Sequence, residues 1–252
     1  MNGDFVLTKA MAKEFASLDD AKGRRRSGIF VAEGRKCVET LLQGGFVPRH
    51  IFTESGAGFS FPGSTEVKKV MLREITRLSA TPQVIAFFEI PEFSQKLPSA
   101  DSALVLALDR VQDPGNMGTI LRTADWMGVR TVVASADTVD IYNPKTVQAS
   151  MGAIARVRVV YTDLPAYLGS LAPETPVYGT FLDGDVIYSQ PLSTSGVVVM
   201  GNEGRGISEA VAAHVNRRLF IPPGAGCVSE SLNVSVATAI VLSQFRQRQY
   251  NG

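Results

Sequence analysis

The sequence predicts an α/β protein whose main sheet is mostly parallel, with helices on both faces. Two observations carry this prediction. Short apolar stretches of strand length alternate with helix-like stretches over the second half of the chain, and this alternation is typical of parallel sheets that are buried on both sides. The chain has 252 residues, 45% of them hydrophobic, which is enough to form a substantial core in one or two domains.

Residues 1–92 predict a small α/β domain. A helix is expected over residues 5–18, followed by the strand GIFVAEG and the helix RKCVETLLQGG. HIFTES and QVIAFFEIP predict two more strands, and the charged stretch STEVKKVMLREITRLS between them predicts one amphipathic helix or two short ones. The polar stretch that follows has no clear period and predicts a linker over residues 93–102.

Residues 103–252 predict the larger domain. Its expected strands are ALVLALD, TVVAS, RVRVVY, PVYGTFLD, GVVVMGNE and RLFIPP. Its expected helices are TILRTADWMG, NPKTVQASMGAI, residues 208–215 and residues 232–247. The last of these helices is small and apolar nearly all round, which predicts burial in the core or against a second subunit.

Composition excludes several classes of protein. Cys37 and Cys227 have no second cysteine or histidine cluster nearby, so neither a zinc site nor a disulfide framework is expected, and a reducing cytoplasm fits best. The sequence has no secretory signal and no apolar stretch that approaches the ~20 residues of a membrane span. Net charge is only +1, but residues 1–98 hold 14 Lys and Arg against 11 Asp and Glu, and the remainder holds 11 against 13.

Three segments that follow predicted strands carry unusual polar residues. In the first, LDRVQDPGNMGTILRTADWMG, Asn116 lies in a Gly-rich turn and Arg122 on the helix after it. In the second, VVVMGNEGRGIS, three glycines allow backbone N–H groups to face a ligand. In the third, FIPPGAGCVSESLNVSVATAI, Ser231 and Asn233 precede the last helix. Ligands in open α/β sheets bind beyond the carboxyl ends of the strands.

A structural interpretation of each segment stays open on the residues alone. Asn116 would then cap its helix and Arg122 would be a solvated charge. The glycine segment would be a plain tight turn, because its order fits neither the dinucleotide-binding nor the P-loop pattern. The polar residues of the third segment would be helix caps.

Taken together and in this order, the three segments closely resemble the motifs of the SpoU/TrmH family of RNA 2'-O-ribose methyltransferases, in the SPOUT superfamily. The resemblance spans roughly residues 103–247. The stretches FVAEGRKCVETLL and ITRLSATPQVIAFFEIP also resemble the L30e-like substrate-binding domain of that family. The resemblance implies a deep C-terminal trefoil knot, S-adenosylmethionine as cofactor, no metal, and a homodimer formed through the knotted domains.

The resemblance also implies a set of site residues. The cofactor-binding residues would be Thr180, Leu182, Gly201, Asn202, Ile221, Ser231, Leu232 and Asn233. The polar catalytic residues would be Asn116, Arg122, Glu203, Ser231 and Asn233. A guanidinium is a poor base at neutral pH, so we expect Arg122 to clamp an RNA phosphate and stabilise the developing alkoxide. Glu203 would orient Arg122 through a charge pair.

The implied reaction is methyl transfer from S-adenosylmethionine to a ribose 2'-hydroxyl. Because a separate N-terminal domain is present, we expect the substrate to be large-subunit ribosomal RNA. RNA phosphates would be held by Arg24, Arg25, Arg26, Lys36 and Arg122. A merely solvated charge run explains the first four of these residues equally well. The alternatives are the same reaction on transfer RNA and a non-catalytic RNA-binding protein of the same fold.

Overall fold

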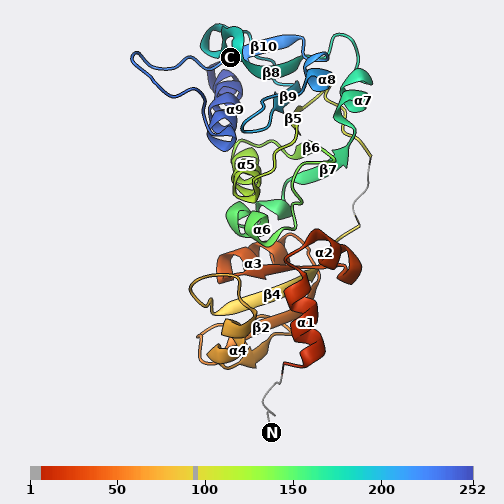
Figure 1. The fold of residues 1–252 in the computed structure, drawn as a ribbon, viewed down its shortest axis with the longest axis vertical. Helices are drawn as coiled ribbons and strands as arrows, with labels where there is room; N and C mark the ends of the chain where they lie inside the picture. The colour runs from red at the N-terminus through yellow and green to blue at the C-terminus, as the bar shows by residue number, and fades with distance from the viewer. Residues whose placement is uncertain (1–6, 93–95, 252) are drawn as a thin grey trace. The chain divides into compact units, whose positions relative to one another are not determined.

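The structure is a computed structural model that describes residues 7–92 and 96–251 (Figure 1). The chain forms two compact units. Unit 1 contains Met1–Phe93 and Asp140–Arg156, and unit 2 contains Ser94–Val139 and Val157–Gly252. A segment from the middle of the predicted second domain therefore belongs to unit 1. Among the described residues, no helix combines the length and the apolarity that a membrane crossing requires.

Unit 1 is built on a four-stranded mixed sheet with the order β1-β4-β2-β3. Strands β1 and β2 are antiparallel to β4, and β3 is parallel to β2. The strands are β1 Ile29–Glu33, β2 Pro48–Glu54, β3 Thr65–Val67 and β4 Val84–Glu89. The helices are α1 Lys9–Ser17, α2 Ala21–Ser27, α3 Arg35–Gln43, α4 Lys69–Ile75 and α6 Pro144–Ser150, with the 3-10 turn η1 Ala153–Ala155.

The predicted elements of unit 1 need three corrections. The expected first helix begins at Lys9, and residues 5 and 6 lie outside the described residues. The short helix α2 was not predicted; Asp20 caps it by accepting the Gly23 N–H at 2.6 Å. The charged stretch after β2 is an edge strand of three residues followed by α4, because Val67 is buried in the core beside the sheet.

Both faces of the unit 1 sheet are covered, and all five residues of β1 are buried. On one face, α1 places Phe15 against Phe87, with ring centroids 3.7 Å apart. On the other face, the ring centroids of Phe30 and Tyr142 lie 4.8 Å apart, and Tyr142 lies two residues before the start of α6. Apolar burial of this kind is the main stabilising contribution to a core. The segment Asp140–Arg156 therefore supplies part of the core of unit 1.

Unit 2 is built on a six-stranded sheet with the order β10-β8-β9-β5-β6-β7, in which every neighbouring pair is parallel. Helices α5 and α9 pack together on one face, and α7 and α8 lie on the other (Figure 1). The strands are β5 Leu104–Leu108, β6 Thr131–Ser135, β7 Arg158–Thr162, β8 Val177–Val186, β9 Gly196–Met200 and β10 Arg217–Phe220. The helices are α5 Pro114–Trp126, α7 Leu164–Gly169, α8 Glu209–Ala212 and α9 Val234–Asn251, with the 3-10 turn η2 Ile187–Ser189.

The predicted parallel sheet with helices on both faces is confirmed in unit 2. Its central strand β9 is buried at all five positions, as a strand covered on two faces must be. Two helices differ from expectation. The short helix α7 was not predicted, and α5 begins at Pro114, five residues before the predicted start, because Asp113 caps it.

Candidate functional site

The predicted cofactor and catalytic residues lie mainly at one edge of the six-stranded sheet. Strands β10, β8, β9 and β5 are neighbours and run in the same direction, so their carboxyl ends meet at a common edge. The segments that leave the ends of β5, β9 and β10 are residues 109–113, 201–208 and 221–233, and residues 180–184 of β8 lie beyond its pairing with β9. Loops at this edge are where open α/β sheets bind ligands.

The exit of β5 is fixed by hydrogen bonds to two other loops. Asp109 is buried and accepts the Ser208 N–H at 2.6 Å. Arg110 has a φ of 59°, which residues other than glycine seldom adopt. Its N–H donates to the Ser135 hydroxyl at 2.9 Å, and its carbonyl accepts from Nδ2 of Asn202 at 2.8 Å. The surrounding structure thus holds Arg110 in a costly backbone conformation.

The exit of β9 is a tight turn organised by Asn202. Its Oδ1 accepts the N–H groups of Gly204 and Arg205, both at 3.0 Å, and its backbone exchanges two hydrogen bonds with Gly206. The returning chain passes directly over Gly201, where a Cβ would lie 2.3 Å from the carbonyl carbon of Gly206. Only glycine fits at position 201 in this turn.

Four of the predicted residues form one hydrogen-bonded cluster, the Glu203 cluster, which consists of Asn116, Asn202, Glu203 and Asn233. Asn116 donates from Nδ2 to Oε1 of Glu203 at 3.0 Å, and its Oδ1 accepts from Nδ2 of Asn233 at 2.9 Å. Asn202 donates to the other carboxylate oxygen of Glu203 at 3.3 Å. Residues from the start of α5, the turn after β9 and the segment before α9 are thereby brought together around one carboxylate.

Helix capping, the structural alternative for the polar residues, applies to Asn233 but not to Asn116. The alternative that Asn116 caps α5 is wrong, because Asp113 is the cap and accepts the Asn116 N–H at 2.7 Å. The side chain of Asn116 is therefore left for the Glu203 cluster. Asn233 has both roles, since its Oδ1 accepts the N–H of Ser235 at 2.9 Å at the start of α9.

Arg122 lies on the exposed surface of α5. Within the described part of the chain it makes no ion pair with Glu203, whose two carboxylate oxygens accept from Asn116 and Asn202 instead. The expected pairing of Arg122 with Glu203 is therefore not what the structure contains. Ser231 is also exposed, so both side chains are accessible to a ligand.

The other predicted cofactor residues come from the neighbouring strand ends. Thr180 and Leu182 lie on the last part of β8, and Ile221 follows β10. Leu182 is 78% exposed and Leu232 is 47% exposed, so both side chains are accessible to a ligand. Apolar side chains and loop backbone at this edge would fit the neutral adenosine group of the cofactor that the family resemblance implies, and the Glu203 carboxylate would suit a sulfonium.

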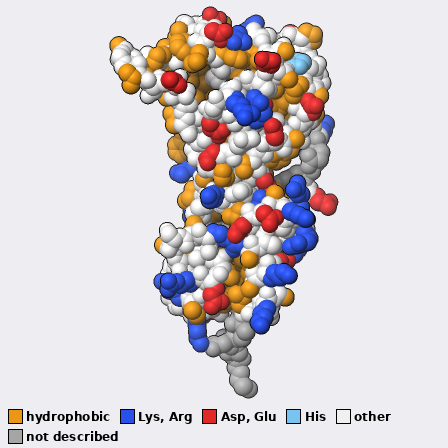
Figure 2. Space-filling view, viewed as in Figure 1, with side chains coloured by type: hydrophobic (Ala, Val, Ile, Leu, Met, Phe, Trp, Pro, Cys, Tyr) orange, Lys and Arg blue, Asp and Glu red, His pale blue; other side chains and the backbone are white. Residues whose placement is uncertain are grey.

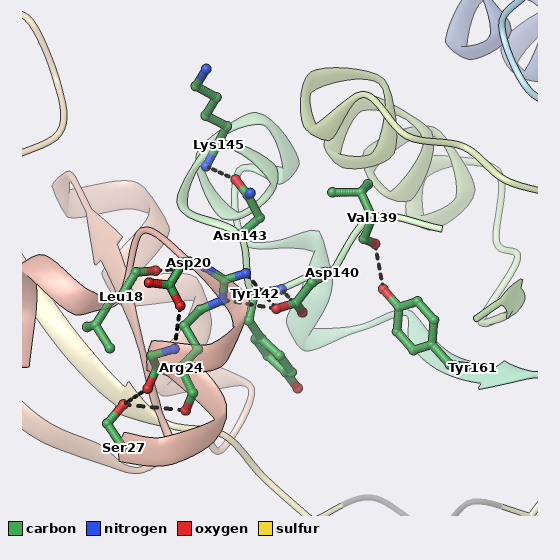
Figure 3. A network of polar contacts seen from close by, with 11 residues as sticks. Leu18, Asp20, Arg24, Ser27, Val139, Asp140, Tyr142, Asn143, Lys145 and Tyr161 are labelled. Carbon is green, nitrogen blue, oxygen red and sulfur yellow. Dashed lines mark hydrogen bonds and ion pairs between the residues drawn. The ribbon is translucent and has the colours of Figure 1, made fainter. Parts of the chain in front are cut away.

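The RNA-binding predictions in unit 1 divide into two outcomes. Arg24 is only 2% exposed. Its Nε and Nη2 donate to one carboxylate oxygen of Asp140 at 2.9 and 2.8 Å, and its Nη1 donates to the Leu18 carbonyl at 2.7 Å (Figure 3). The prediction for Arg24 is therefore wrong, because all of its donor groups face the interior of unit 1.

Arg25, Arg26 and Lys36 are exposed, and their contact with RNA stays a prediction. Figure 2 shows Lys and Arg side chains gathered along the side of unit 1 that carries α1 and α2. Sequence reasoning missed Asp109, Arg110 and Asp140. Asp109 had a visible signal, a charged residue that ends an apolar strand; the other two had none, because their roles depend on residues distant in the sequence.

The family comparison agrees with this geometry. Residues 103–243 match the SpoU rRNA Methylase family, which is more than half of the chain. The chain belongs to this family. Residues 9–86 match the MRM3-like substrate binding domain. A substrate-binding domain in unit 1 therefore precedes the SpoU methylase match in the chain.

Relatives of this SpoU protein match it along nearly the whole chain. The 23S rRNA (guanosine(2553)-2'-O)-methyltransferase of Bacillus subtilis is 34% identical over 241 residues, which cover 93% of this chain and 95% of that protein. The 23S rRNA (uridine(2479)-2'-O)-methyltransferase of Streptomyces viridochromogenes is 26% identical, over 92% of this chain and 88% of that protein.

Solved structures match the fold of the whole SpoU chain. A TrmH-family protein of Porphyromonas gingivalis is 37% identical with a TM-score of 0.84, and covers 97% of this chain and 100% of its own. An rRNA methyltransferase of Sinorhizobium meliloti with bound AdoMet is 28% identical with a TM-score of 0.84, and 96% of each chain is covered.

Proposed function

We propose that this SpoU protein transfers a methyl group from S-adenosylmethionine to a ribose 2'-hydroxyl of large-subunit ribosomal RNA. The observation that carries the proposal is the Glu203 cluster, in which the start of α5, the turn after β9 and the segment before α9 meet. The two curated relatives above, which match nearly the full chain, are named as 23S rRNA 2'-O-methyltransferases. The substrate-binding domain, residues 1–92, would deliver the RNA, and residues 103–252 would hold the cofactor.

The cofactor would lie against the ends of β8, β9 and β10. Leu182, Ile221 and Leu232 would contact its adenosine, and backbone groups at Gly201 and Asn202 would add polar contacts. When bound, S-adenosylmethionine supplies a methyl group that is already activated by its sulfonium charge. The protein therefore has mainly to orient the ribose hydroxyl and to assist loss of its proton, and positioning alone can contribute ~7 to 11 kcal/mol in favourable cases.

Arg122 would provide the positive charge in this mechanism. Its guanidinium would hold an RNA phosphate and stabilise negative charge that develops on the 2'-oxygen. The Glu203 cluster would hold Asn116 and Asn233 in place around the reacting groups, with Ser231 beside them. Arg25, Arg26 and Lys36 would add phosphate contacts in unit 1.

A homodimer would be formed through the outer face of α5 and α9. Trp126, at the end of α5, is 86% exposed, and Val236 on α9 is 48% exposed. Exposed apolar side chains on the two helices would contribute to such a contact, and most soluble homo-oligomers are symmetric dimers. Sedimentation of the wild type should give a dimer, and Trp126→Glu should give a monomer; a monomeric wild type would reject this part of the proposal.

The deep C-terminal trefoil knot remains a prediction from the family resemblance. Methylation of ribosomal RNA would also place the enzyme in the cytoplasm.

The direct experiment is methyl transfer from labelled S-adenosylmethionine to purified 23S rRNA, 16S rRNA and transfer RNA, followed by mapping of linkages that resist alkali. We expect label at a ribose of 23S rRNA. Label on transfer RNA alone would support the alternative substrate. RNA binding without transfer to any of the three RNAs would support a non-catalytic protein and reject the proposal.

A further inference from the structure

Strand β8 leaves the sheet for five residues at the predicted cofactor edge. The consecutive residues Arg218 and Leu219 of β10 pair with Gly179 and Asp185 of β8, so residues 180–184 form an insertion between two pairings. The pairing of β8 with β9 also ends at Gly179. Irregularities of this kind redirect side chains and are common next to active sites. Thr180 and Leu182 lie in this insertion.

Arg218 contacts the residues on both sides of Leu182. Its guanidinium carbon lies 3.6 Å from the centroid of the Phe181 ring, and its Nη2 donates to Oδ1 of Asp183 at 2.6 Å. We call Phe181, Asp183 and Arg218 the Arg218 clasp. The clasp fixes the chain immediately before and after Leu182, while the Leu182 side chain remains largely exposed.

Close backbone packing completes both ends of the insertion. At its start, a Cβ on Gly179 would lie 2.8 Å from Cε2 of Phe181, so the ring is seated directly against this glycine. At its end, a Cβ on Gly184 would lie 2.7 Å from the carbonyl carbon of Leu219. The insertion is therefore tightly packed at both ends, and its second end lies against β10.

The contact with Arg218 also favours the ionised form of Asp183. The hydrogen bond from Arg218, and then its charge, hold the pKa of the Asp183 carboxyl below its usual value. Asp183 is thus an anion and Arg218 a cation at neutral pH. Both of these side chains are exposed to solvent, so the ion pair contributes little to the free energy of unfolding. Its effect is on the local conformation of residues 180–184.

We infer that Arg218 is a positioning residue for cofactor binding, which holds residues 180–184 so that Thr180 and Leu182 can meet the adenosine of S-adenosylmethionine. The inference rests on the proposed function, because it requires the cofactor to bind at this edge. Arg218 itself touches neither the cofactor nor the reacting groups in this account. Loss of its guanidinium would lower the fraction of molecules in which residues 180–184 have the conformation that binds the cofactor. The apparent Kd for the cofactor would rise in proportion.

The test compares the wild type with Arg218→Met, which retains an unbranched side chain but loses the guanidinium. Calorimetry with S-adenosylmethionine gives the cofactor Kd, and fluorescence anisotropy with an rRNA fragment gives the RNA Kd. We expect the Kd and KM for the cofactor to rise roughly tenfold, with kcat at saturating cofactor and the RNA Kd within about twofold of the wild type. Arg218→Lys, which keeps the charge without the planar stack, should restore part of the affinity.

Two outcomes for Arg218→Met would overturn the inference. Unchanged cofactor affinity would show that the clasp does not shape the site, and weaker RNA binding with unchanged cofactor affinity would make Arg218 a phosphate contact. Should Arg218→Met fail to fold, Arg218→Lys and Asp183→Asn decide the question: we expect a higher cofactor Kd in both, and wild-type values in both would reject the inference. A wild type that binds no S-adenosylmethionine would instead reject the proposed function.

Discussion

Two polar networks in this protein join residues far apart in the sequence, and they differ in burial. In unit 1, Arg24 and Asp140 lie 116 positions apart and are joined by two short hydrogen bonds. In unit 2, Asn116 and Glu203 lie 87 positions apart and are joined by one. Arg24 is almost completely buried and its hydrogen bonds end on unit 1, whereas the Glu203 cluster lies at an accessible sheet edge.

The difference separates a structural polar network from one that a ligand can reach. A buried charge must be paired, because leaving it unpaired is costly, so the Arg24 network is closed and has no group left for a ligand. The Glu203 cluster includes a solvent-exposed side chain, Asn233. Arg122 and Ser231, which belong to the predicted site, are exposed as well. Burial, and not residue type, decides which arginine can meet RNA.

The largest expected effect is from Asp140→Ala, which leaves the Arg24 guanidinium buried without its partner. Breaking a fully buried pair costs about 3 to 5 kcal/mol; Asp140 is one third exposed, so we expect the lower end of that range. Urea unfolding measures it. The control is Glu39→Ala, which removes a more exposed ion pair with Arg35 and should cost less than about 1 kcal/mol. Equal effects would mean that the Arg24 network is not structural.

Arg122→Ala should lower activity and leave stability almost unchanged, whereas Asp140→Ala mainly lowers stability. Loss of a charge that stabilises the transition state lowers kcat by about 10²- to 10³-fold, while the free energy of unfolding should stay within about 0.5 kcal/mol of the wild type because the side chain is exposed. Single-turnover methyl transfer and urea unfolding are the measurements. Nearly full activity in Arg122→Lys would argue against a specific guanidinium role.

Gly201→Ala should damage the turn after β9. Its Cβ would overlap the backbone of Gly206 and Ile207, and overpacking of this kind costs about 1 to 3 kcal/mol. We expect weaker cofactor binding by calorimetry together with lower stability. Gly204→Ala is the matched control, because its nearest neighbour would be Oδ1 of Asn202 at 3.9 Å. If both variants bind the cofactor like the wild type, the turn does not shape the site.

The smallest effect distinguishes two members of the Glu203 cluster. Asn233→Ala removes both the cap of α9 and a hydrogen bond to Asn116, so it should lower stability by about 0.5 to 2 kcal/mol and also lower activity. Asn116→Ala leaves the cap Asp113 intact and should lower activity with little change in stability. Thermal unfolding and kcat measure the two properties, and a reversed pattern would contradict the assignment of the caps.

Much of unit 2 could be predicted from the sequence because its signals are local. Runs of five apolar residues such as β9 are long enough to identify a strand that is buried on both faces. The order of three motifs likewise identified Asn116, Glu203 and Asn233 before their contacts were known. Unit 1 was harder: β3 has only three residues, too few to show a period beside a longer helix-like pattern.

The sequence by itself determined the α/β alternation, the family resemblance and the residues of the predicted site. Only the tertiary structure decided what each polar residue does. Arg24 is buried because Asp140, which lies beyond β6, packs into unit 1. Glu203 accepts from Asn116 because parallel strands bring their ends to one edge. A charged side chain looks the same in a sequence whether it is solvated or paired, since its partner is chosen by folding.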